Sequence, residues 1–355
     1  MHQKIEKHLT KKNLIEHCHK NSKIYEKVYR ECLNLSGENL LIIGDHGFSN
    51  RNASSMLSYM NYLASQNQGL KSKVVWQKPK NRVSQADTEI IRALKALPKK
   101  SVIFTNISHR LGKLDGLGNS FRKFCKKQGH RFISSTSLAG IYNSDYKKLM
   151  NTLDVDYKRL SKRHDKLKKK MDNAKEVQVT TKKGTDLFID IDNIESKKAD
   201  GIYLEPGTGG NLPSGEVYVA PRNRQAFGKV VLDVSIKTIS GTIPVNQPVS
   251  LYVENGDVKY IRGGYEARAL QKSLDWAFKT ANTTWGLKRI GELGIGLNDR
   301  AKPVGSTLID EKVLGTAHVA IGSNYWFGGS VKSKIHLDHV FSKPEIRLDG
   351  RKINY

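Results

Sequence analysis

The sequence predicts a chain of two parts: an α/β domain with a largely parallel sheet over residues 1–145, and a strand-rich α+β domain over residues 176–355. Three observations lead to this prediction. Short apolar runs alternate with helical patterns in the first part, polar and apolar residues alternate in the last part, and a lysine-rich stretch at 146–175 separates the two. A chain of 355 residues is long enough to give each part its own core.

The first domain is expected to begin with helices and continue as alternating strands and helices. Residues 1–35 set apolar side chains among charges at helical spacing. The predicted strands are Asn39–Gly44, Lys73–Trp76, Ser101–Thr105 and His130–Ser134, and the helices between them are a segment starting at Ser49, Glu89–Leu97 and Phe121–Lys127. This alternation is typical of a parallel sheet covered by helices.

Residues 146–175 place leucines among many lysines and arginines, which indicates one long basic helix that links the domains. We expect it to be a solvated connector, with contact to nucleic acid as the alternative. From Glu176 the pattern becomes that of strands. They are predicted at 176–181, Thr185–Ile191, Lys229–Ile236, Val249–Val253 and Val258–Ile261, followed by a helix at Tyr265–Ala281.

The net charge of +26 is concentrated in the first half of the chain. Residues 1–175 contain 36 Lys and Arg against 14 Asp and Glu, a balance of +22, whereas residues 176–355 contain 24 against 20, a balance of +4. A half of the chain with this positive charge could bind nucleic acid or an acidic partner. The lysines are scattered and lack interleaved aromatic residues, so a solvated lysine-rich surface is the favoured interpretation.

The composition also restricts the location and the class of the protein. No apolar run approaches the length needed to cross a membrane, and the basic N-terminus has no apolar segment behind it, so neither a membrane span nor a secretory signal is expected. Cys18, Cys32 and Cys125 are an odd number without CxxC spacing. They are interpreted as idle thiols in a reducing, cytoplasmic protein.

The last segment brings together residues that can bind a divalent metal. Glu292 lies in the glycine-rich stretch 291–296, and His318 is flanked by apolar residues. His336 and Asp338 stand at positions i and i+2, which on a strand share one face. Imidazole nitrogens and carboxylate oxygens at fixed separations are what hydrolytic metal sites require.

Each of these residues also has a plainer interpretation. An isolated histidine among apolar residues is usually a hydrogen-bonded core residue, an H-x-D pair arises easily by chance, and Glu292 could lie in an exposed turn. Four candidates within about fifty residues, in settings where burying a polar group is costly, make a metal site in the C-terminal domain as good an interpretation as the plainer one.

The segment Asn211–Pro221, NLPSGEVYVAP, resembles the signature of the aminopeptidase T / aminopeptidase S family of metallopeptidases. In that resemblance Glu216 is a ligand glutamate. The stretches around Glu292 and His318, then Tyr325 and the closing His-x-Asp at 336–338, match further motifs of the family in the same order. The resemblance is specific over residues 176–350 and only architectural over 1–150.

The resemblance implies a two-metal aminopeptidase, and it also implies a role for each matching residue. Glu292 would bridge two divalent ions (Zn, Co or Mn), with Glu216 and Asp338 on one ion and His318 and His336 on the other. Tyr325 would be a ligand or a donor to the developing oxyanion, and Glu292 and Tyr325 would be the catalytic residues. A peptide or small-molecule amide substrate and a homodimer are also implied.

The interval between His318 and His336 is shorter than in a typical member of this family. The compact form looks like a related branch that includes 2,5-dihydroxypyridine 5,6-dioxygenase, and a mononuclear Fe(II) ring-cleaving dioxygenase is therefore the second hypothesis. The third is a basic nucleic-acid-binding protein with a vestigial metal site. Retention of both Glu216 and Glu292 favours the two-metal hydrolase among the three.

Overall fold

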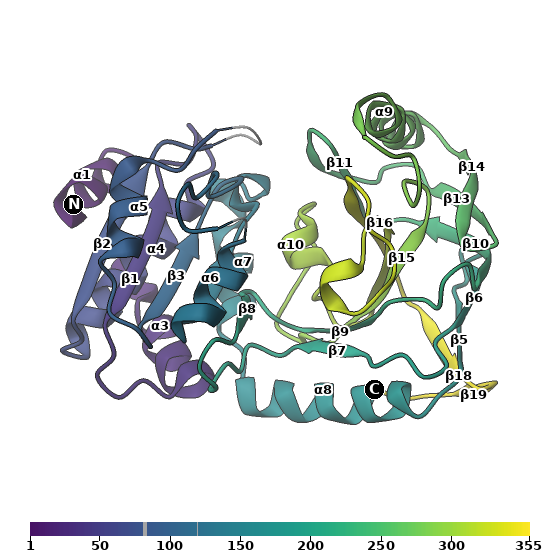
Figure 1. Cartoon of the computed structure of the whole chain (residues 1–355), viewed down its shortest axis with the longest axis horizontal. Coiled ribbons are helices and arrows are strands. Elements are labelled where there is room, and N and C mark those ends of the chain that lie inside the picture. Colours follow the sequence, from purple (N-terminus) through teal and green to yellow (C-terminus); the bar gives the residue numbers. More distant parts are fainter. Residues whose placement is uncertain (81–83, 119) are drawn as a thin grey trace. The chain divides into compact units, whose positions relative to one another are not determined.

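The computed structural model describes residues 1–80, 84–118 and 120–355. The chain forms two compact units (Figure 1). The first contains Met1–Lys158 and Gly201–Ser214, and the second contains Arg159–Asp200 and Gly215–Tyr355. The two-part α/β arrangement expected from the sequence is therefore present, and a short later segment of the chain returns to the first unit.

The first unit is built on a five-stranded parallel sheet with the strand order β2-β1-β3-β4-β8. Its elements are α1 (His2–Thr10), α2 (Ile15–Asn21), α3 (Lys23–Val28), η1 (Tyr29–Leu33), β1 (Leu40–Asp45), α4 (Ala53–Asn67), β2 (Ser72–Gln77), α5 (Thr88–Lys95), β3 (Val102–Asn106), α6 (Phe121–Gln128), β4 (Arg131–Ser135), η2 (Leu138–Gly140), η3 (Asn143–Asp145), α7 (Tyr146–Leu153) and β8 (Gly209–Asn211).

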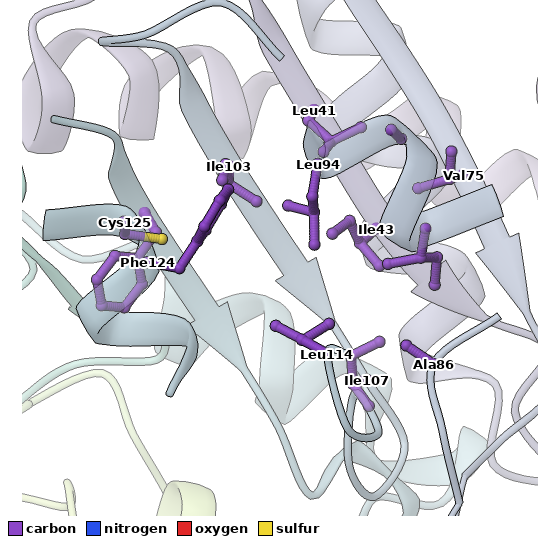
Figure 2. Packing of buried hydrophobic residues seen from close by; sticks show 13 residues of the cluster. Leu41, Ile43, Val75, Ala86, Leu94, Ile103, Ile107, Leu114, Phe124 and Cys125 are labelled. Carbon is purple, nitrogen blue, oxygen red and sulfur yellow. The ribbon is translucent and has the colours of Figure 1, made fainter. Parts of the chain in front are cut away.

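Helices cover both faces of this sheet, as expected for a parallel sheet. One face packs against α5 and α6 through an apolar cluster that includes Ile43, Ile103 and Phe124 (Figure 2). The other face lies against α4, which approaches so closely that a Cβ at Gly44 would stand 2.2 Å from Ser58 Oγ. The predicted strands and helices of residues 39–134 are present with small shifts of their ends.

The second unit contains two seven-stranded antiparallel sheets, with the orders β14-β13-β10-β6-β5-β18-β19 and β12-β11-β17-β16-β15-β9-β7. Its elements are β5 (Glu176–Thr180), β6 (Asp186–Asp190), β7 (Lys197–Ala199), β9 (Glu216–Val219), β10 (Ala226–Leu232), β11 (Ser235–Thr238), β12 (Gly241–Pro244), β13 (Val249–Glu254), β14 (Asp257–Arg262), α9 (Tyr265–Thr280), β15 (Ile290–Gly296), α10 (Thr307–Asp310), β16 (Thr316–Gly322), η4 (Tyr325–Phe327), β17 (His336–Ser342), β18 (Glu345–Leu348) and β19 (Arg351–Lys352).

The single long helix expected at 146–175 is wrong. The segment forms α7 and then α8 (Tyr157–Asp172), because the chain leaves the helical path at Asp154. Nor is α8 a solvated connector. Its residues Leu160, His164, Leu167 and Met171 are buried at helical spacing, and its Arg159 and Arg163 pair with Asp299.

The strand expected at Lys229–Ile236 is also two strands, since β10 and β11 belong to different sheets. The break falls at Asp233, whose carboxylate accepts hydrogen bonds from the backbone N–H and the hydroxyl of Ser342. The glycine-rich segment before Asn211 contributes β8, a parallel strand paired with β4, which the sequence did not indicate.

No helix in the described part of the chain is long and apolar enough to span a membrane. Cys18, Cys32 and Cys125 are buried, and they form no disulfide in the described part of the chain.

The buried His164 on α8 gives a pH-dependent stability that can be measured. Its Nδ1–H donates to the Leu160 carbonyl at 2.7 Å, and burial lowers its pKa to about 4. The unfolded chain, with an ordinary imidazole, binds this proton near pH 6.5, so stability is lost as the pH falls from 6.5 towards 4, by up to about 3 kcal/mol. Compared with a His164→Leu variant, the wild-type protein should lose more unfolding free energy between pH 7.5 and pH 5.

Chemical denaturation at several pH values measures this difference. A His17→Gln variant, altered at an exposed position, serves as the control and should follow the wild type. Equal pH slopes for wild type and His164→Leu would contradict the assignment.

Candidate metal centre

Four neighbouring strands of the second unit carry the candidate ligands. Glu216 begins β9, Glu292 lies on β15, His318 on β16, and His336 and Asp338 on β17. These strands are adjacent in the order β17-β16-β15-β9. The structure therefore gathers, on one sheet, residues that are separated by up to 122 positions in the chain (338 minus 216).

The register of the strands puts all five side chains on the same face. Ala320 pairs with both Glu292 and Asp338, His318 and His336 each stand two residues from one of these positions, and Glu216 pairs with Gly296. Because side chains alternate along a strand, every one of them points to the same side. The other face carries mainly apolar side chains, which are buried.

Gly294 makes room for one of the imidazoles. It pairs directly with His318, and a Cβ at this position would lie 2.0 Å from Cε1 of the His318 ring. A side chain at 294 would thus occupy the place where the imidazole stands. This close approach to His318 requires the glycine at 294, whereas Gly291 and Gly296 lie against the backbone carbonyls of Gly322 and Val313.

The ligand atoms form a continuous set of short contacts. His318 Nε2 lies 3.1 Å from Glu292 Oε1 and 3.8 Å from Glu216 Oε2. His336 Nε2 lies 2.9 Å from Asp338 Oδ1 and 3.6 Å from Glu292 Oε2. Metal–ligand bonds of about 2.1 Å at right angles put neighbouring ligand atoms about 3 Å apart, so these separations suit a common cation.

One imidazole is fixed in the orientation that metal binding requires. His336 Nδ1 lies 2.7 Å from the carbonyl oxygen of Ser323. A carbonyl only accepts, so Nδ1 carries the hydrogen and Nε2 faces Glu292 and Asp338. The loop after Ser323 is in turn held by Asn324, whose side chain accepts from Val331 N–H and donates to the Gly291 carbonyl.

The field at the site favours positive charge. Burial alone would lower the pKa of His318, but its contact with Glu292 and the charge of Glu216 raise it to about 9. Against the same effect of burial, Asp338 and Glu292 raise the pKa of His336 to about 10. Burial would raise the pKa of Asp338, yet His336 holds it well below its usual range. A cluster that attracts protons this strongly also attracts a metal cation.

Sequence reasoning missed two charged members of the cluster, Glu311 and Lys312, which directly follow α10. The Lys312 ammonium is fully buried and lies 2.5 Å from Glu216 Oε1 and 2.6 Å from Glu311 Oε1. Burial acts to lower its pKa, but the two carboxylates raise it overall. For Glu216 and Glu311, burial raises the pKa and the adjacent ammonium opposes that effect. At these separations the ammonium stabilises both carboxylates in their charged form.

Tyr325 lies differently from the five candidate ligands. It begins the turn η4, its side chain is 62% exposed, and Lys332 stands over its ring at 5.5 Å. Its expected catalytic role stays a prediction. The two residues that follow it are closer to the cluster, because the rings of Trp326 and Phe327 lie 4.8 and 6.4 Å from His336.

Two buried polar atoms without partners are consistent with a cation-binding site. Among the described residues, Glu216 Oε2 and His318 Nδ1 are buried without a hydrogen-bond partner. Glu216, Glu311 and His318 each offer a ligand atom within 4.8 Å of the others. Buried polar groups without partners are rare, and a bound ion is one explanation for them. The donors therefore fit a divalent metal.

Comparison with known proteins separates fold from activity. Two solved structures are similar over nearly the whole chain. The 2,5-dihydroxypyridine dioxygenase of Pseudomonas putida KT2440 has a TM-score of 0.69 at 20% identity, covering 95% of each chain. AmpT from Thermus thermophilus has a TM-score of 0.62 at 15% identity, covering 94% of this chain and 99% of that one. At such identities the likeness shows a shared fold, including the expected relationship to aminopeptidase T.

The sequence comparisons overturn the expected activity. The curated 2,5-dihydroxypyridine 5,6-dioxygenase of P. putida KT2440 is 26% identical over 186 residues, which are 51% of this chain and 53% of the relative. The chain thus matches about half the length of that relative. The main hypothesis of a hydrolase, aminopeptidase or protease is wrong, because the curated relative and the matching family model are both described as a dioxygenase.

The family model described as 2,5-dihydroxypyridine 5,6-dioxygenase (NicX) matches residues 144–354, which contain every candidate ligand. This match covers more than half of the chain, and the chain therefore belongs to the NicX family.

Proposed function

We propose that this protein is a metal-dependent dioxygenase that opens the ring of a dihydroxylated nitrogen heteroaromatic compound. The observation that carries the proposal is the convergence of His318 Nε2 and His336 Nε2 on the carboxylates of Glu292 and Asp338. Two imidazoles and one carboxylate, with positions left open, are the usual donor set of non-haem Fe(II) oxygenases. Membership of the NicX family supports the same reaction class.

The residues present would hold one ion. His318 and His336 supply the imidazole nitrogens, and Glu292 or Asp338 supplies the carboxylate. When bound, Fe(II) supplies the electron-transfer chemistry that makes O₂ reactive towards a ring. The carboxylate that is not needed as a ligand would accept the proton of a substrate hydroxyl.

For 2,5-dihydroxypyridine we propose the reaction that the name of the relative describes. The bond between ring carbons 5 and 6 breaks, and each of these carbons takes one oxygen atom of O₂. The ring is oxidised and O₂ is reduced, so no other oxidant or reductant is consumed. The residues of this chain bind and orient the ring and hold the hydroxyl proton.

An aromatic wall beside the ligands suits a planar substrate. The Trp326 ring packs edge-on against His336 and remains 57% exposed, and Phe327 packs edge-on against Tyr218. A large exposed indole next to a metal ligand offers a surface on which an aromatic ring can stack. This placement is the second reason to prefer a ring substrate.

Oxygen uptake tests the proposal directly. Protein loaded with Fe(II) under anaerobic conditions should consume one O₂ for each 2,5-dihydroxypyridine that loses its ring absorption. A His336→Leu variant should lose both metal and activity, by about a thousand-fold or more in rate, because a metal ligand is removed. His339→Leu is the matched control: the residue lies on the same strand but on the opposite face, so this variant should keep both.

Loss of metal and activity in His339→Leu as well as His336→Leu would show that the effect is not local to the site. A wild-type protein that binds Fe(II) yet leaves every dihydroxylated N-heteroaromatic compound intact would contradict the proposed reaction.

The space at Gly294 gives a separate test of the geometry. A Gly294→Ala variant should displace the His318 ring, since its Cβ would lie 2.0 Å from Cε1, and metal affinity should fall by about ten-fold or more. Val319→Ala, which shortens a buried side chain on the opposite face of β16, controls for lost stability alone. Isothermal titration with Mn(II) measures both; unchanged affinity in Gly294→Ala would contradict the role given to His318.

The aromatic wall predicts an effect on substrate binding without an effect on metal. Trp326→Ala should raise KM for the ring substrate about five- to ten-fold through the lost stacking surface, with a smaller change in kcat and the same metal content. Trp285→Ala, which removes another exposed tryptophan, is the control. A KM that does not move in Trp326→Ala would remove this residue from the substrate site.

A further inference from the structure

Lys312 is an unusual residue for the middle of a protein. It is among the largest side chains with no exposed surface, and a lysine is almost never fully buried unless it is paired. Its position is fixed by its backbone, because its N–H donates to the Ile309 carbonyl and its carbonyl accepts from Asn298 N–H. The side chain is therefore directed into the cluster by a short, well-bonded segment.

The ammonium lies between two carboxylates that could otherwise hold a metal ion. Glu216, Glu311 and His318 offer ligand atoms within 4.8 Å of one another, a spacing suited to one cation. Lys312 Nζ contacts Glu216 Oε1 at 2.5 Å and Glu311 Oε1 at 2.6 Å. An ammonium donates hydrogen bonds and carries one positive charge, so it satisfies both carboxylates as an ion would.

We infer that the Lys312 ammonium takes the place of a second metal ion, so that the carboxylates of Glu216 and Glu311 are compensated by the chain itself and a single ion binds at His318, His336 and one of the carboxylates of Glu292 and Asp338. The inference rests on the proposed function for that single ion. It also goes beyond it, because it assigns to Lys312 the control of how many ions the cluster accepts.

An ammonium in the place of a second metal ion restricts the reactions that the site can catalyse. A two-metal centre uses its second ion to polarise a substrate and to bind a second attacking or leaving oxygen. An ammonium has no open coordination position and cannot do this. Lys312 therefore explains why this member of a dioxygenase family keeps the carboxylates that would bind two metal ions in a hydrolase.

Metal counting tests the inference without any assay of activity. Wild-type protein, stripped with a chelator and dialysed against Mn(II), should contain one ion per chain by elemental analysis. Lys312→Met should contain two, because the carboxylates of Glu216 and Glu311 then lack their cation. Lys312→Arg, which keeps the charge, and Lys259→Met, which removes an exposed lysine, should each contain one.

Further variants are needed in case Lys312→Met fails to fold. Removing one partner of a buried ion pair costs about 3–5 kcal/mol when the other charge is left alone. Lys312→Gln keeps a hydrogen-bond donor between the carboxylates and should also take up two ions. The double variant Glu311→Gln, Lys312→Met lacks one of the freed ligands and should return to one.

The difference between variant and wild type decides the inference. One additional ion in Lys312→Met or Lys312→Gln supports it. An equal count in folded variants overturns it, and so does a wild-type protein that already binds two ions, a result that needs no variant. A wild-type protein that binds no ion contradicts the proposed function instead, and the Lys312 inference then stands only if its variants gain one.

Discussion

The alternation of side chains along four neighbouring strands is the constraint on which the site depends. Glu216, Glu292, His318 and the His336–Asp338 pair reach one face only because β9, β15, β16 and β17 pair in one register. A slip of one residue in any strand would turn its charged side chains into the apolar interior and its apolar ones outward. The apolar core on the opposite face therefore positions the ligands, since the same register satisfies both faces.

A cluster assembled in this way carries a strong negative charge, which must be compensated by positive charge. Four carboxylates stand close together, at positions 216, 292, 311 and 338. Burying them without cations would be costly, and the raised pKa values of His318 and His336 express that cost. Lys312 provides a permanent part of the compensation. A bound divalent ion would supply the rest and would take the place of protons on the two imidazoles.

Sequence reasoning could find the ligands on the strands but not the residues that reach them from elsewhere. In the H-x-D pair at 336–338 and in the GELGIG stretch at 291–296, residues two positions apart lie on the same face of a strand. The sequence alone therefore indicates which of their side chains point the same way. Glu311 and Lys312 carry no such pattern, because they follow a four-residue helix and meet Glu216 across 95 or more positions (311 minus 216). The sequence predicted β10 and β11 as one strand, because the break at Asp233 involves a hydrogen bond from the distant Ser342. The homodimer and the role of Tyr325 stay predictions, and nucleic-acid binding by the basic first half stays an untested alternative to a solvated surface.

The ligands themselves could not have distinguished a hydrolase from an oxygenase. Imidazoles and carboxylates on one sheet face serve both kinds of chemistry, and the fold shared with AmpT does not by itself assign a reaction. What differs lies beside the ligands. In our proposal the buried ammonium of Lys312 prevents a second cation from binding, and the exposed indole of Trp326 contacts the ring of the substrate. On that proposal the residues that contact the ligands, rather than the ligands, carry the information about the reaction.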